Sequence, residues 1–174
     1  MTTWTIDPVH SEVAFKVKHL VVSTVTGHFN TFSATITAAD DSFSAATISF
    51  EADVNSIDTK NEQRDGHLKS ADFFDAEHNP KLTFVSKKVE PREENEYTVI
   101  GDLTIRGITH EVKLNATYNG TVAGFGGKTV AGFELKGKLN RQDFGLSWGA
   151  LTEASGIVVS DEVKLEINAE MIKN

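Results

Sequence analysis

Three polar residues near the middle of the chain, Arg64, Asp65 and His67, form its densest cluster of groups that could do chemistry. A histidine beside a carboxylate can transfer protons when both lie within hydrogen-bond reach of a substrate. The same residues can instead pair with backbone and neighbouring groups to hold a short helix against the fold. We favour this second interpretation and predict no catalytic residue. An acid–base enzyme that uses Asp65 and His67 on a lipid-like substrate is the first alternative.

Other reactive sites find little support in the sequence. The chain has no cysteine, which excludes disulfides, thiolate nucleophiles and cysteine-based metal sites. Its six histidines show no H-x-H or HExxH spacing, and nucleophile-elbow, P-loop and dinucleotide fingerprints are absent, so no metal or cofactor is predicted. His19 shares a face with apolar residues, which favours a buried, hydrogen-bonded core histidine over a ligand contact.

Composition narrows the class of protein. The 174 residues fit one domain, 1–174, and the formal net charge of −8 disfavours both nucleic-acid binding and a polybasic membrane contact. The segment Met1–Pro8 lacks the basic and apolar regions of a signal peptide, and no apolar run approaches the length of a membrane span. We therefore expect a cytoplasmic protein.

Alternation of apolar and polar residues dominates the chain and predicts β-strands with one dry and one wet face, as in antiparallel sheets. The clearest examples are 12–19, 44–54, 97–105, 112–118 and 163–171. Turn signals separate these segments, among them Arg106-Gly107 and Asn119-Gly120. The fold class is therefore all-β.

One segment, residues 59–76, breaks the alternation. Thr59 and Glu62 have the spacing of a capping box, which predicts a short polar helix after Thr59. Two adjacent aromatic residues, Phe73 and Phe74, follow that helix, and we expect them to cover one end of the fold. The sequence thus predicts a helical insertion near the middle of an otherwise β-rich chain.

The strands can pack as a sandwich or close into a barrel, whose interior is either filled or holds a small ligand. Eleven Phe against two Trp and two Tyr leave the dry faces few polar groups, which weakly favours a ligand. From pattern alone, we favour a filled core for the candidate wall residues. They are Phe15, Val17, Phe29, Phe32, Phe84, Leu103, Ile105, Phe133 and Leu135.

Several motifs, taken in order, resemble the YceI-like family of polyisoprenoid-binding proteins over nearly the whole chain. They begin with Trp4-Thr-Ile-Asp-Pro, Phe15-Lys-Val-Lys-His-Leu, Gly27-His-Phe and Ser56-Ile-Asp-Thr. They continue with Arg64-Asp-x-His-Leu-Lys-Ser, Asp72-Phe-Phe, Pro80-x-Leu-Thr-Phe, Gly101-Asp-Leu-Thr-Ile-Arg-Gly and Asn140-Arg-x-x-Phe-Gly. Each motif alone is weak, and their combination is specific.

The resemblance implies a lipocalin-like, eight-stranded antiparallel β-barrel with a short helical insertion near residues 59–76. It implies an elongated apolar pore for a polyprenyl chain, isoprenoid quinone or fatty ligand, and frequently a homodimer. On this basis we predict a non-enzymatic carrier; a packed β-domain for protein interaction is the second alternative. The family's motifs also place Asp65 and Arg141 among their matching positions. The predicted ligand-binding residues are Phe15, Val17, His19, Phe29, Phe32, Arg64, His67, Leu68, Phe73, Phe74, Phe84, Leu103, Ile105, Phe133, Leu135 and Phe144.

Overall fold

The computed structural model describes residues 1–149 and 159–174. In these residues one α-helix, α1, spans Glu62–Lys69. The strands are β1 (Thr2–Ile6), β2 (Glu12–His19), β3 (Ser23–Phe29), β4 (Phe32–Ala38), β5 (Thr47–Asp53), β6 (Ile57–Asp58), β7 (Lys81–Pro91), β8 (Glu96–Ile105), β9 (Ile108–Ala123), β10 (Thr129–Asn140) and β11 (Glu162–Lys173). Short 3₁₀ turns are η1 (Pro8–His10), η2 (Val54–Ser56), η3 (Phe125–Gly127) and η4 (Arg141–Phe144).

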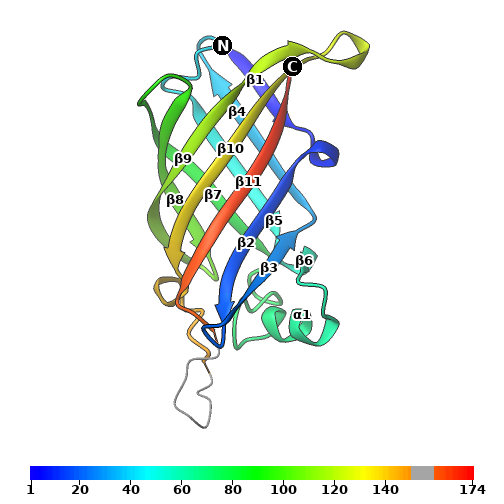
Figure 1. Cartoon of the computed structure of the whole chain (residues 1–174), viewed down its shortest axis with the longest axis vertical. Helices are drawn as coiled ribbons and strands as arrows, with labels where there is room; N and C mark the ends of the chain where they lie inside the picture. Colours follow the sequence, from blue (N-terminus) through cyan, green and yellow to red (C-terminus); the bar gives the residue numbers. More distant parts are fainter. Residues whose placement is uncertain (150–158) are drawn as a thin grey trace.

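The strands pair antiparallel and close into a barrel, because β1 bonds both β4 and the last strand, β11. Strands β1 and β2 act as two halves of one long strand: η1 interrupts it, and both halves pair with β11. The next strand of the barrel consists of β4, which pairs with β1, and β3, which pairs with β2. The strand after that consists of β5, which pairs with β4, and β6, which pairs with β3. The result is the predicted eight-stranded antiparallel barrel with one short helix (Figure 1).

One of the two turns predicted from sequence forms, and the other is a bulge within a strand. Arg106 and Gly107 have φ of 53° and 72° and form the predicted two-residue turn between β8 and β9. The turn predicted at Asn119-Gly120 is wrong, because β9 continues to Ala123. There the pairing with β10 shifts register beside Phe133, and Gly120 has φ of 114°, so this pair forms a β-bulge instead.

The helix forms where the alternation stops, but its cap differs from the prediction. The side-chain oxygen of Asn61, not Thr59, accepts the hydrogen bond from the backbone N–H of Arg64. Asparagine is as good an N-cap as threonine or better, and it leaves the Thr59 hydroxyl available for other contacts. Within the residues that the structure describes, no helix is both long enough and apolar enough to span a membrane.

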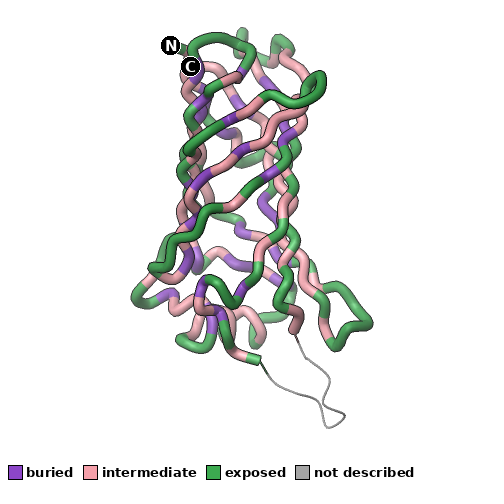
Figure 2. The backbone as a smooth tube through the Cα atoms, turned by 90° about the vertical axis from the view of Figure 1, so that its left-hand side faces the viewer, coloured by how far each residue is buried: buried purple, intermediate pink, exposed green. Residues whose placement is uncertain are grey.

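Buried and exposed stretches alternate along the strands, as Figure 2 shows, because successive side chains point to opposite faces of the sheet. The inward side chains form two apolar clusters. One lies around Trp4, Phe43 and Phe133, and the larger one includes Phe73 and Phe144. Both chain termini lie at one end of the barrel and α1 lies at the other (Figure 1).

Candidate ligand cavity

The inward side chains do not fill the barrel. They enclose a cavity of about 370 Å³, within the range of small-molecule sites in proteins. On β11 its wall runs from Val163 to Met171. At about 3.3 Å per residue and a strand tilt of about 40°, this wall extends about 20 Å along the barrel axis. The filled core favoured by the alternation alone is therefore wrong.

Phe43 closes the cavity at the end where the chain termini lie. Its ring meets that of Phe133 edge to face, with centroids 4.9 Å apart, and also packs on Trp4 and Tyr118. Phe43 is 3% exposed and has φ of 59°, which turns the β4–β5 connection inward. Phe43 is not among the predicted wall residues, because it belongs to no alternating segment.

Aromatic side chains also gather at the α1 end. The His67 ring lies edge to face against Phe73 and Trp148, with centroids 5.2 and 4.6 Å away. Phe74 lines the cavity beside them and contacts Phe29 at 6.0 Å. Trp148, which was also missed, follows η4 in irregular backbone where no periodicity could indicate its direction. As expected, Phe73 and Phe74 lie at one end of the barrel.

Arg64 and Asp65 both bind Thr59, which is 4% exposed. The Thr59 hydroxyl accepts from Arg64 Nε at 2.8 Å and donates to Asp65 Oδ1 at 2.5 Å. Arg64 Nη2 also donates to the Thr59 carbonyl at 2.6 Å, and the Thr59 N–H donates to Asp65. His67 Nε2 instead lies 2.8 Å from Asp72 Oδ2. Asp65 therefore anchors the helix and does not form an acid–base pair with His67.

The polar part of the cavity wall is rich in nitrogen donors. Among the described residues no aspartate or glutamate lines it. Most of its polar members are at the α1 end, and they can donate to a head group with acceptor oxygens or negative charge. The polar lining residues are Lys18, His19, Thr59, Arg64, His67, Tyr97 and Arg141.

Of these, Arg141 is occupied by the protein itself. It is 4% exposed and donates to the carbonyls of Leu146, Trp148, Val159 and Ser160. Burial lowers the pKa of its guanidinium from the ordinary value, although Asp161 at 3.4 Å opposes that effect. Arg141 thus holds the chain around η4 against the segment that leads into β11, and this explains its place in the family motif.

Most of the residues predicted to bind ligand line the cavity, and two do not. Phe32 packs on Phe50 with centroids 6.4 Å apart, and Phe144 is 1% exposed against His110, so neither reaches the cavity surface. His19 lines the cavity and is half-buried, so the prediction of a buried core histidine is wrong. The members that line it are Phe15, Val17, His19, Phe29, Arg64, His67, Leu68, Phe73, Phe74, Phe84, Leu103, Ile105, Phe133 and Leu135.

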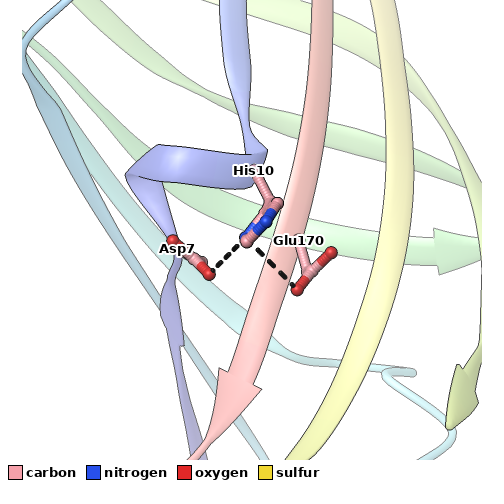
Figure 3. A group of neighbouring side chains, drawn as sticks. All are labelled: Asp7, His10 and Glu170. Atoms are coloured by element: carbon pink, nitrogen blue, oxygen red, sulfur yellow. Dashed lines mark hydrogen bonds and ion pairs between the residues drawn. The ribbon is translucent and has the colours of Figure 1, made fainter. Parts of the chain in front are cut away.

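One cluster outside the barrel has metal-ligand residue types. His10 Nδ1 lies 2.9 Å from Asp7 Oδ2 and 4.0 Å from Glu170 Oε1 at the outer surface (Figure 3). Asp7 also accepts from the Val9 N–H and caps η1, so it has a structural role at the break between β1 and β2. The His10 side chain is 63% exposed, and exposed groups of this kind are common without a metal ion.

The geometry agrees with comparison to known proteins. A family model described as the YceI-like domain matches residues 4–171. The chain belongs to the YceI-like family. A UPF0312 protein of Staphylococcus epidermidis is 39% identical over 171 residues, which cover 98% of this chain and 97% of that protein.

Solved structures of YceI-like barrels extend the likeness to the fold. The crystal structure of the Campylobacter jejuni YCEI protein has 35% identity and a TM-score of 0.77, covering 90% of each chain. A polyisoprenoid-binding domain from Saccharophagus degradans has 15% identity and a TM-score of 0.68, covering 98% of each chain. Because only 15% of residues are identical, the similarity to the Saccharophagus degradans domain concerns the fold alone.

Proposed function

We propose that this YceI-like protein binds and carries a long apolar molecule, such as a polyprenyl chain, an isoprenoid quinone or a fatty ligand, without changing it chemically. The observation that carries the proposal is the apolar cavity of about 370 Å³ along the barrel axis, with its donor groups concentrated at one end. The Saccharophagus degradans domain, which shares the fold, is named for binding polyisoprenoids. That name supports the same ligand class here.

The energetics favour long chains. Burying a five-carbon isoprene unit contributes about 3–4 kcal/mol, at about 0.8 kcal/mol for each buried CH₂. Association costs about 4–15 kcal/mol in lost freedom of motion, so a single unit barely binds. Three units contribute about 9–12 kcal/mol, which exceeds the association cost over most of its range, and each further unit adds to the margin. We infer that the chain lies against Phe84, Leu103 and Leu135, with its head group near His19 and His67.

The contacts around α1 support a carrier over the acid–base enzyme, because Asp65 bonds Thr59 and His67 bonds Asp72. The open interior likewise supports a carrier over a packed interaction module. The homodimer stays a prediction. Sedimentation velocity, which measures the oligomeric state in solution, tests it directly.

Mass spectrometry of an organic extract from purified protein, beside a heat-denatured and washed control, tests the proposal. We expect a polyprenyl, quinone or fatty species in a stoichiometric amount that is lost on denaturation. An extract that stays empty, even after incubation with polyprenols and quinones, contradicts it.

Matched variants of Leu135 connect the ligand to the cavity. The larger side chain in Leu135→Trp occupies part of the lumen and should lower ligand occupancy at least about tenfold. The volume-conserving Leu135→Met should keep the occupancy unchanged. Equal occupancy in the two folded variants would place the ligand elsewhere.

A further inference from the structure

The turn between β2 and β3 presents three consecutive aliphatic side chains to solvent. Leu20, Val21 and Val22 are 40%, 74% and 84% exposed. Single exposed apolar residues are common, but contiguous ones mark interaction sites more often. We call these three residues the aliphatic tip.

The backbone of the aliphatic tip is unfavourable for its residues. Leu20 and Val21 have φ of 53° and 65°, in the left-handed region. The Val22 N–H donates to the His19 carbonyl, so Leu20 and Val21 are the two central residues of a β-turn. Asn-Gly suits a turn in which both central residues have positive φ, and a β-branched residue with positive φ is a conformational outlier. Asn-Gly would serve folding better, so the aliphatic residues indicate a role outside folding.

The aliphatic tip lies beside the opening of the cavity. The strand residues next to it, Lys18, His19 and Val25, all line the cavity. Lys18 is the single lining residue of the exposed class in the part of the chain that the structure describes, so it marks the rim. The turn lies at the same end of the barrel as α1, opposite the end closed by Phe43 (Figure 1).

The chain segment that contains the tip has no acidic residue. The chain holds 25 Asp and Glu residues, yet none occurs between Val13 and Ala39. Lys16 pairs with Glu166 at 3.1 Å, but Lys18 Nζ bonds only the Thr24 hydroxyl, at 2.8 Å, among its described neighbours. Within the described residues, the tip therefore combines aliphatic groups with a lysine that forms no ion pair.

We propose that the aliphatic tip docks into the surface of a phospholipid bilayer. Leu20, Val21 and Val22 enter the boundary between head groups and acyl chains, and Lys18 meets lipid phosphates. Docking in this orientation brings the cavity opening against the lipid phase, where apolar chains reside. The proposal goes beyond the carrier function and does not depend on which ligand the cavity holds.

Flotation of the full chain with vesicles tests docking without reference to any cavity ligand. The probes are phosphatidylcholine vesicles with and without phosphatidylglycerol. We expect the protein to float with the mixed vesicles, and the double variant Leu20→Asn/Val21→Gly to lower its partition at least about tenfold. The same variant should keep or raise the melting temperature, because Asn-Gly relieves the strained turn.

The β9–β10 hairpin at the other end supplies the control. Phe125 there is 100% exposed, so Phe125→Ser removes a comparable apolar group away from the opening, and partition should stay unchanged. Absence of flotation, equal flotation of the double variant, or loss with Phe125→Ser alone would overturn the proposal. Self-association that the double variant abolishes would instead make the tip a protein interface. An empty ligand extract with normal flotation would refute the carrier function and leave docking standing.

Discussion

The Phe15 ring lies directly over Gly27, its cross-strand partner on β3, so that a β-carbon at position 27 would come within 2.6 Å of ring atom Cε1. Real β-carbons do not approach other atoms so closely. The absence of a side chain at Gly27 therefore sets the position of Phe15, which in turn forms part of the cavity wall. This contact gives the Gly27-His-Phe motif a physical reason.

We expect Gly27→Ala to push the Phe15 ring into the lumen and to lower the affinity for an apolar probe. The accompanying loss in free energy of unfolding should be smaller than the loss in free energy of binding. Gly66→Ala is the matched control, because nothing lies within 4 Å of a β-carbon there. That change inside α1 should stabilise the protein by about 0.5–1 kcal/mol and leave affinity alone. Fluorescent-probe titration and thermal melts measure both. Unchanged affinity in Gly27→Ala would show that Phe15 moves outward.

The Thr59 hydroxyl should contribute to stability through its bonds with Arg64 and Asp65. Thr59→Val keeps the shape but removes this bridge, and should lower the free energy of unfolding by about 1–3 kcal/mol. Thr59→Ser retains the hydroxyl and should recover most of the loss. Denaturant titration measures the difference, and equal stability of the Val and Ser variants would exclude the hydroxyl as the cause.

The two tryptophans should report ligand binding unequally. Trp148 lines the α1 end of the cavity, whereas Trp4 is fully buried behind Phe43 and lines no part of it. A quinone should therefore quench the fluorescence of Trp148 more strongly. We expect Trp148→Phe to lose most of the quenching and Trp4→Phe to keep it. The reverse pattern would place the quinone at the end that Phe43 closes.

The pair at η1 should titrate as a unit. The hydrogen bond from His10 lowers the pKa of Asp7, and the hydrogen bond to Asp7, together with the charge of Glu170, raises the pKa of His10. The His10 contribution to stability is present below its ordinary pKa and is lost as pH rises through its raised pKa. The Asp7 contribution is present above the ordinary carboxyl pKa and is lost as pH falls. The pair therefore stabilises most between about pH 4 and pH 6.5.

Asp7→Asn should lower the pKa of His10 toward that of a free histidine. His78, whose pKa is raised by Asp75, should stay unchanged and serves as the internal control. NMR titration of the ring protons resolves the two. A His10 pKa that does not move would mean that Glu170 alone holds the proton.

Alternation was sufficient to predict which strand residues point inward, because the side-chain direction in a strand reverses at each residue. That is why Leu103, Ile105 and Leu135 were found. Alternation cannot separate a cavity wall from a packed contact, so it predicts Phe32 in the wall although this ring packs on Phe50. Phe144 is predicted through the family motif alone, which does not show that its ring packs against His110. Phe43 and Trp148 lie outside regular strands, where direction depends on tertiary structure.

A lumen that Phe43 closes at one end and that opens beside Lys18 limits how much of a chain it can take up. Affinity should rise with each added carbon until the tail meets the Phe43 ring, and then level off, because further carbons stay in water outside. The distance from Phe43 to the rim therefore acts as a molecular ruler. It also dictates a single polarity of loading: the tail goes in first, and the head group is the last part to enter and the first to leave.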